Sequence, residues 1–393
     1  AKITKFATYG THFNLDGTID IVKLSGIKIE YVDLIIKNLN GDENSIKANF
    51  NYSDNTCSFS TSDEINTGVD LENLPIDTYY MFIKVTYSNS DIKYYSLVND
   101  SEYSDITYYT ITKNNSNNKI DISFNTYNDT KYLSIVVSKA QNLPDDVYDI
   151  AIDPARGGLD RGSTSGEYTE ADLVLNYGLK LKSELENLGL KVYISRDSNS
   201  SEKEDTANNM YSENGRINIL NASHAKLLLS LQINGTSYNK KTGGIEIYAP
   251  SNCNLDFATC LAGNIVNKSG LYYSENTQFK KADGVYVRNF TNSDILAFKS
   301  NAIKGKYEPY NITLTTPYLY IIRETGGIST TAFVDGRNTK YGTNKYYNSN
   351  TGIESYVVDL GYMSIEKDLS IIVNNMSGYI DGILNSVKTY CNL

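Results

Sequence analysis

Histidine is scarce in this chain, which has only His12 and His224 among 393 residues. Catalytic schemes and metal sites that need two or three histidines are therefore nearly excluded. Tryptophan is absent and there are only six prolines, whereas tyrosine reaches 34 residues. The four cysteines form no CxxC pair and no zinc-ligand spacing; they are Cys57, Cys253, Cys260 and Cys391. A Cys253–Cys260 disulfide and free thiols are both compatible with the sequence.

Positive charge and long apolar runs are also lacking. Lys and Arg total 36 against 46 Asp and Glu, which gives a formal net charge of −10. This balance argues against nucleic acid and against a polybasic membrane contact. No apolar run approaches the roughly 20 residues of a membrane span. The chain begins at Ala1 without a basic and then apolar leader, so we expect that a signal peptide has been removed.

Residues 1–145 have the pattern of short β-strands. Apolar side chains alternate with polar ones from Tyr79 to Tyr87 and from Ile120 to Phe124, and this period of two is typical of half-buried strands. Turn-forming segments rich in Asn, Asp and Ser separate them. We therefore predict an all-β, sandwich-like domain over 1–145, with a boundary near 141–149.

Residues 146–393 alternate between predicted strands and predicted helices. The expected strands are 147–152, 190–194, 225–233, 244–248, 318–322 and 355–360, and the expected helices are 170–188, 206–223, 255–269 and 366–390. Such alternation predicts an α/β domain built on a mostly parallel, twisted sheet with helices on both faces. Residues 326–353 form a long segment without a clear pattern, which we interpret as an insertion.

Three motifs follow strands and a fourth opens a helix. They are Asp153-Pro154-Ala155-Arg156-Gly157-Gly158, Glu170-Ala171-Asp172-Leu173, Ser230-Leu231-Gln232-Ile233-Asn234 and Val358-Asp359-Leu360-Gly361-Tyr362. In open α/β sheets, functional sites gather at the carboxyl ends of the strands. We therefore expect these segments to form one site.

In this order the four motifs resemble those of the zinc-dependent N-acetylmuramoyl-L-alanine amidases of type 3. The family pattern is Asp-Pro-Gly-His-Gly-Gly, then a helix-opening Glu, then Ser-Ile-His-Ala-Asn, and finally Glu-Leu-Gly-Phe. The resemblance extends from about 149 to the C-terminus. It implies an amidase-type α/β fold, a location in the cell wall or outside the cell, and action on the muramoyl–L-alanine amide of peptidoglycan.

The resemblance breaks down at the residues that carry the chemistry. In the family, two histidines and a glutamate hold zinc, and a further glutamate polarises the bound water. Here the histidine positions are Arg156 and Gln232, the glutamate ligand is Glu170, and the catalytic glutamate is replaced by Asp359. Arginine does not lose its proton in a protein, and its charge repels a divalent ion. We therefore predict that zinc, the family cofactor, is absent and that the position of Asp359 no longer functions in catalysis.

The same substitutions suggest how the site is held together without a metal. We expect the Arg156 guanidinium to bridge Glu170 and Asp359, with Gln232 donating a further hydrogen bond. The alternative is that Arg156 points into solvent. We also expect Glu246 to face solvent or line a groove.

Three functions remain open at this stage. The first is an inactive, amidase-like cell-wall protein, a pseudoenzyme that binds peptidoglycan, its stem peptide or a cell-wall protein. The second is an active N-acetylmuramoyl-L-alanine amidase. The third is a structural or adhesive cell-surface protein that acts through its β domain. Zinc content separates the first two, and peptidoglycan binding by each domain separates the first from the third.

Overall fold

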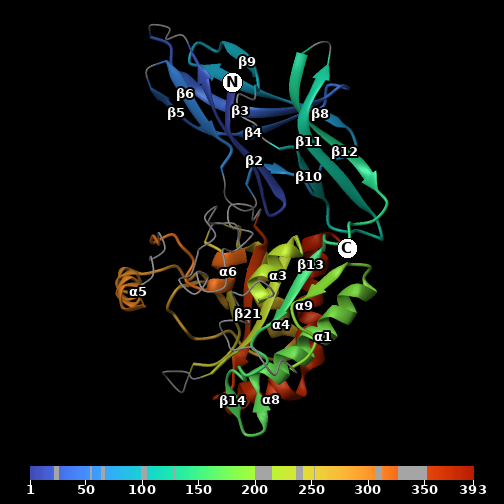
Figure 1. The fold of residues 1–393 in the computed structure, drawn as a ribbon, viewed down its shortest axis with the longest axis vertical. Coiled ribbons are helices and arrows are strands. Elements are labelled where there is room, and N and C mark those ends of the chain that lie inside the picture. Colours follow the sequence, from blue (N-terminus) through green and yellow to red (C-terminus); the bar gives the residue numbers. More distant parts are fainter. Residues whose placement is uncertain are drawn as a thin grey trace. The chain divides into compact units, whose positions relative to one another are not determined.

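A computed structural model describes residues 1–21, 26–53, 55–62, 67–98, 104–127, 130–199, 215–235, 242–251, 253–305, 312–325 and 352–393. They form two compact units, one of Ala1–Ile111 with Ser116–Leu143 and one of Thr112–Asn115 with Pro144–Leu393 (Figure 1). That segments 1–145 and 146–393 fold independently stays a prediction. Apart from its last two residues, the predicted insertion at 326–353 lies outside the described residues.

The first unit is all-β in its described residues and contains two antiparallel sheets. One sheet has the order β1 (Lys2–Tyr9), β2 (His12–Asp20), β6 (Thr56–Ser60), β5 (Asn49–Ser53), with β7 (Val69–Asp70) beside β2. The other has the order β10 (Ile106–Tyr109), β11 (Asn117–Tyr127), β12 (Thr130–Ala140), β8 (Thr78–Tyr87), β3 (Ile29–Asn38), β4 (Glu43–Lys47), with β9 (Ile92–Ser96) beside β8. Side chains from both sheets form one apolar cluster, to which β2 contributes Phe13 and Leu15 and β8 contributes Met81 and Ile83.

The second unit is built on a seven-stranded sheet. Its order is β16 (Val192–Ile194), β13 (Ile150–Pro154), β17 (Leu227–Asn234), β21 (Glu354–Tyr362), β18 (Glu246–Tyr248), β20 (Val285–Tyr286), β19 (Lys280–Ala282). The first four strands are parallel, whereas β18 runs antiparallel to β21. Every residue of β13 and β21 is buried, as expected for central strands covered on both faces. A small hairpin, β14 (Thr164–Ser165) and β15 (Tyr168–Thr169), precedes the first helix.

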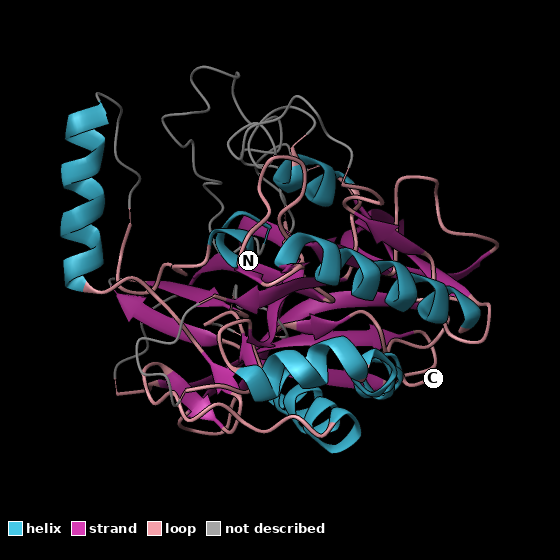
Figure 2. Cartoon of the chain, turned by 90° about the horizontal axis from the view of Figure 1, so that it is seen from below, coloured by secondary structure: helices cyan, strands magenta, loops and turns pink. Residues whose placement is uncertain are grey.

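Helices cover both faces of this sheet, and Figure 2 shows them on either side of the strands. They are α1 (Glu170–Asn187), α3 (Arg216–Ala222), α4 (Asp256–Ser269), α6 (Tyr320–Thr325), α8 (Glu366–Asn374) and α9 (Met376–Cys391), whereas α5 (Asn292–Gly305) stands apart from the sheet (Figure 1). Helices α3 and α6 pack over Ala151 of β13, whereas α1 lies against the neighbouring Ile152, whose side chain points the other way. Helices α1 and α9 meet through Tyr177 and Tyr379.

Two predicted elements of this unit were wrong. The expected strand 318–322 is helix α6, in which Arg323 N donates to Leu319 O and the Thr325 hydroxyl to Ile321 O. A short apolar run in sequence does not distinguish a strand from a buried helix. The expected closing helix 366–390 is two helices separated at Asn375, whose side chain caps α9 by accepting from Gly378 N.

Three smaller points complete the comparison with the sequence predictions. The helix expected at 206–223 is described only from residue 215 onward, where α3 begins at Arg216. Helix α5 was not predicted. All four cysteines are free, so Cys253 and Cys260 are not joined.

Candidate functional site

The carboxyl ends of β13, β17 and β21 lie side by side because these strands are adjacent and parallel. They bring together the loop with Arg156, the strand position of Gln232 and the strand position of Asp359, and the last two are direct neighbours in the register. Glu170, the first residue of α1, is fully buried beside them. All four predicted site residues therefore lie at one edge of the sheet.

Arg156 makes the contact with Glu170 that the sequence predicted. Its Nε lies 3.2 Å from Glu170 Oε2, while Nη1 lies 3.5 Å from Asp160 Oδ2. The side chain is 39% exposed, so it is partly in solvent while its inner nitrogen faces a buried acid. The expected bridge from Arg156 to Asp359 is wrong, because the tight turn from Gly157 to Asp160 places Asp160 as the second acidic partner.

The backbone around Arg156 is unusual. Its φ is +67°, a left-handed conformation that is uncommon for a residue with a side chain. Gly162, at φ +63°, permits the close approach of this loop, because a Cβ there would overlap the carboxylate of Glu170 and Cγ of Arg156. A strained residue at a strand end is typical of functional sites.

Glu170 is held by donors on both carboxylate oxygens. Oε1 accepts from Ile233 N at 3.2 Å, and Oε2 accepts from Ser163 N at 2.9 Å and faces the Arg156 guanidinium. A buried carboxylate with two backbone amides and an arginine has its charge compensated without a metal ion.

Gln232 does not donate to the carboxylates, contrary to the sequence prediction. Its Nε2 lies 3.3 Å from the hydroxyl of Ser230, two residues earlier on the same face of β17. The Ser230 hydroxyl in turn donates to Asp153, which is also bonded by the Ser195 hydroxyl and lies 3.5 Å from buried Arg216. Asp153 therefore serves to join β13, β17 and α3.

Glu246 is a site residue whose burial and pairing with Asp359 the sequence did not predict. It is the antiparallel neighbour of Asp359 and only 1% exposed, so of the two expected places, solvent or the lining of a groove, the first is wrong. The reason is topological, because β18 lies inside the sheet between β21 and β20. Its carboxylate accepts hydrogen bonds from five neutral side chains: Ser274 at 2.7 Å, Tyr248 at 2.8 Å, Tyr362 at 2.9 Å, Asn276 at 3.3 Å and Asn234 at 3.5 Å.

Asp359 is 6% exposed and lies in an unfavourable environment for a charge. Burial, and then repulsion from Glu246 and Glu170, raise its pKa well above the usual value, and Arg156 and Asn234 offset this only in part. The protonated form of Asp359 is therefore favoured. The only sequence signal for this pairing was the presence of a glutamate within the apolar strand 244–248.

These side chains do not fit a zinc ion. Zinc sites use imidazole, thiolate and carboxylate ligands in a tetrahedral arrangement. Here Glu170 has donors on both oxygens, and the two family histidine positions carry a guanidinium and an amide. A permanent cation 3.2 Å from the Glu170 carboxylate opposes a second cation there.

The comparison with family profiles identifies the class of protein. The profile of Amidase_3, N-acetylmuramoyl-L-alanine amidase, matches residues 150–388, which is more than half of the chain. The chain belongs to this family and is an amidase-like cell-wall protein. No curated protein matches its sequence at a significant level.

Solved amidase structures are similar to the chain at low identity. They include an N-acetylmuramoyl-L-alanine amidase from Clostridium difficile 630, with 16% identity over 63% of this chain and 98% of that chain, at a TM-score of 0.39. The catalytic domain of CwlV from Bacillus (Paenibacillus) polymyxa has 17% identity over 63% and 98%, at 0.39. The CwlD amidase of Clostridioides difficile, solved in complex with the GerS lipoprotein, has 17% identity over 62% and 99%, at 0.38. Among the described residues, no helix is long and apolar enough to span a membrane.

Proposed function

We propose that this chain is a pseudoenzyme of the amidase family, which keeps the fold and binds a cell-wall partner without hydrolysing the muramoyl–L-alanine amide. The partner is peptidoglycan, its stem peptide or a cell-wall protein, and the protein acts outside the cell after removal of a signal peptide. The observation that supports this proposal is the ion pair of Arg156 with Glu170, two residues that the motif resemblance aligns with zinc ligands of the family.

The ion pair matters for catalysis because hydrolysis of the amide requires an activated water molecule. Bound zinc lowers the pKa of water from 15.7 to about 7, which makes hydroxide available at neutral pH. A guanidinium offers no coordination position to a water molecule, and burial with acidic neighbours raises the pKa of Asp359 well above its usual value. Arg156 therefore cannot lower the pKa of a water molecule in the way that a bound zinc ion does.

Binding remains possible because part of the site reaches solvent. The Arg156 side chain is 39% exposed, and Gln232 and Asn234 are half-buried beside it. A guanidinium and two amides can donate to carbonyl and carboxylate oxygens, which peptide stems present.

The test measures metal content, amide hydrolysis and binding on the same protein. The purified chain is incubated with zinc and then dialysed to remove unbound metal, and it is expected to carry no stoichiometric zinc. It should release no new L-alanine amino termini from purified peptidoglycan. It should nevertheless sediment together with that peptidoglycan. About one zinc per chain, with hydrolysis lost in Asp359→Asn, would show an active amidase instead.

A double variant supplies the positive control for the metal measurement. Arg156→His with Gln232→His restores the two family histidines, and Glu170 is already in place. This variant is expected to take up zinc, whereas Arg161→His, at an exposed position of the same loop, is not. If the wild-type chain takes up as much zinc as the double variant, the interpretation of Arg156 as a metal substitute is incorrect.

A further inference from the structure

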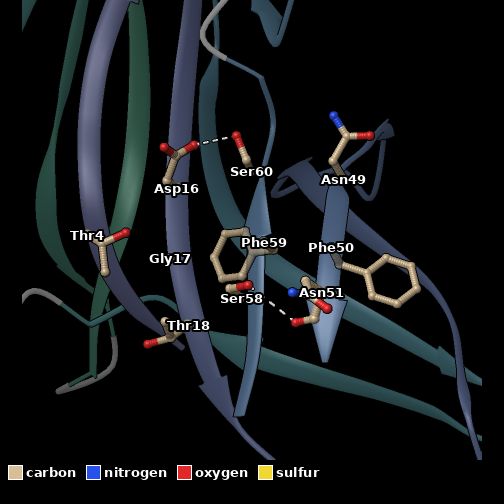
Figure 3. Close-up of a pocket in the computed structure, with 10 residues that line it drawn as sticks. All are labelled: Thr4, Asp16, Gly17, Thr18, Asn49, Phe50, Asn51, Ser58, Phe59 and Ser60. Atoms are coloured by element: carbon tan, nitrogen blue, oxygen red, sulfur yellow. Dashed lines mark hydrogen bonds between the residues drawn. The ribbon is translucent and has the colours of Figure 1, made fainter. Parts of the chain in front are cut away.

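The first unit has a cavity of its own on the sheet formed by β1, β2, β6 and β5 (Figure 3). Its volume is about 420 Å³, within the range of about 300–1,000 Å³ that is usual for ligand sites. Seven polar side chains contribute to its lining: Thr4, Asp16, Thr18, Asn49, Asn51, Ser58 and Ser60.

The strand register explains why these polar side chains gather. Asp16 pairs with Ser60 and Ser60 with Asn49, while Thr18 pairs with Ser58 and Ser58 with Asn51. Directly paired residues, and residues two apart on one strand, project from the same face of a sheet. The sequence therefore builds two parallel rows of small polar groups across three strands.

Most of the hydrogen-bonding capacity of these rows is unused. Asp16 accepts from the Ser60 hydroxyl at 2.6 Å, and the Ser58 hydroxyl lies 3.3 Å from the backbone oxygen of Asn51. Within the described part of the chain, the side-chain amides of Asn49 and Asn51 and the hydroxyl of Thr18 have no intramolecular partner. Each amide is thus free to donate and to accept at the same time.

The chemistry of the lining selects one class of ligand. Amides and hydroxyls match the mixed donors and acceptors of sugar hydroxyl and acetamido groups. Phe50, 37% exposed on the edge strand β5, also borders the cavity, but it alternates with Asn49 and Asn51 and therefore projects from the opposite face of the sheet. Asp16 is the one ionisable residue among those that line the cavity, while Lys5 and Lys2 of the adjacent strand β1 pair with Asp16 and Thr18 of the polar rows.

We propose that this sheet face binds a neutral glycan chain that carries hydroxyl and acetamido groups. The proposal concerns the first unit, and it holds whether or not the amidase-like unit is active.

The experiment uses the full chain and chitohexaose, a neutral oligosaccharide with acetamido groups, in isothermal titration calorimetry. Saturable binding is expected, and Ser58→Arg, which places a long side chain at the exposed centre of the face, should weaken it at least about tenfold. Asn49→Ala with Asn51→Ala should weaken it about tenfold through lost hydrogen bonds. Ser45→Arg, the same substitution at an exposed position of β4, is the matched control and should leave affinity unchanged.

Three outcomes would overturn the proposal. One is the absence of saturable chitohexaose binding by the wild-type chain. Another is equal affinity of the wild type and Ser58→Arg for chitohexaose, which would show that the sugar binds elsewhere. The polar rows would then serve only to protect an edge strand from aggregation. The third is tighter binding of dextran sulfate than of chitohexaose, which would identify a polyanion and not a neutral glycan as the ligand.

Discussion

Two pairs of buried acids lie along one edge of the same sheet, and their charges are balanced in different ways. Asp153 and Glu170, which we name the arginine-paired acids, lie next to Arg216 and Arg156. Glu246 and Asp359, which we name the strand-paired acids, face each other across β18 and β21. In the strand-paired acids, neutral hydroxyl and amide donors surround Glu246, and the raised pKa of Asp359 favours a bound proton.

The difference shows two ways in which an α/β fold can balance the charge of buried acids at its strand ends. An arginine remains charged at every accessible pH, so the negative charge of the arginine-paired acids stays balanced over the whole pH range. The strand-paired acids depend on protonation, so their contribution to stability varies with pH. Substitutions in the first pair should therefore change stability at all pH values, and substitutions in the second should change its pH dependence.

The largest expected effect follows from removing Arg216. This side chain is almost fully buried, and Arg216→Met would leave Asp153 without its cation, so we expect the free energy of unfolding to fall by about 3–5 kcal/mol in urea denaturation. Arg161→Met, at an exposed arginine, should change it by less than about 0.5 kcal/mol.

A second variant shows whether the charge itself is responsible. Arg216→Met combined with Asp153→Asn removes both charges, and it should recover part of the lost stability. If the double variant is no more stable than the single one, lost packing and not unpaired charge explains the effect.

Arg156→Ala should have a smaller effect of the same kind. Glu170 would lose the guanidinium but keep the backbone donors Ser163 N and Ile233 N, and Arg156 itself is partly in solvent. We expect a loss of about 1–3 kcal/mol, measured as for Arg216. A loss as large as that of Arg216→Met would show that the two arginine-paired acids do not differ in this respect.

The sequence predicted the fold well and the site only in part. The amphipathic spacing of α1 and the apolar run of β17 predicted both elements, because their local patterns agree with their final environment. The contact of Arg156 with Glu170 was predictable from the order of the motifs. The burial of Glu246 was not, because it depends on β18 inserting between two strands that lie far from it in the sequence.

The strand-paired acids are tested by pH. The pKa of Asp359 is higher in the folded chain than in the unfolded one, where it is about 3.9. The folded state therefore holds an extra proton above that pH, and stability is lost as pH rises toward the folded pKa. Asp359→Asn should therefore reduce the slope of the free energy of unfolding against pH by up to about 1.4 kcal/mol per pH unit. Urea denaturation at a series of pH values from acid to neutral measures this slope. Asp283→Asn, at an exposed acid, should leave the profile unchanged, and an identical profile in Asp359→Asn would place the proton elsewhere.

The smallest effect is expected at Gln232. Its substitution tests whether a residue at a family ligand position still contributes to the stability of the site. This residue occupies a histidine position of the family pattern, but its one side-chain contact in the described structure is the 3.3 Å hydrogen bond to Ser230. Ser230 retains its bond to Asp153 without it. Gln232→Ala should therefore lower the free energy of unfolding by no more than about 0.5–1 kcal/mol, with no change in the pH profile. A loss comparable to that of Arg156→Ala, or an altered profile, would mean that Gln232 takes part in balancing the strand-paired acids after all.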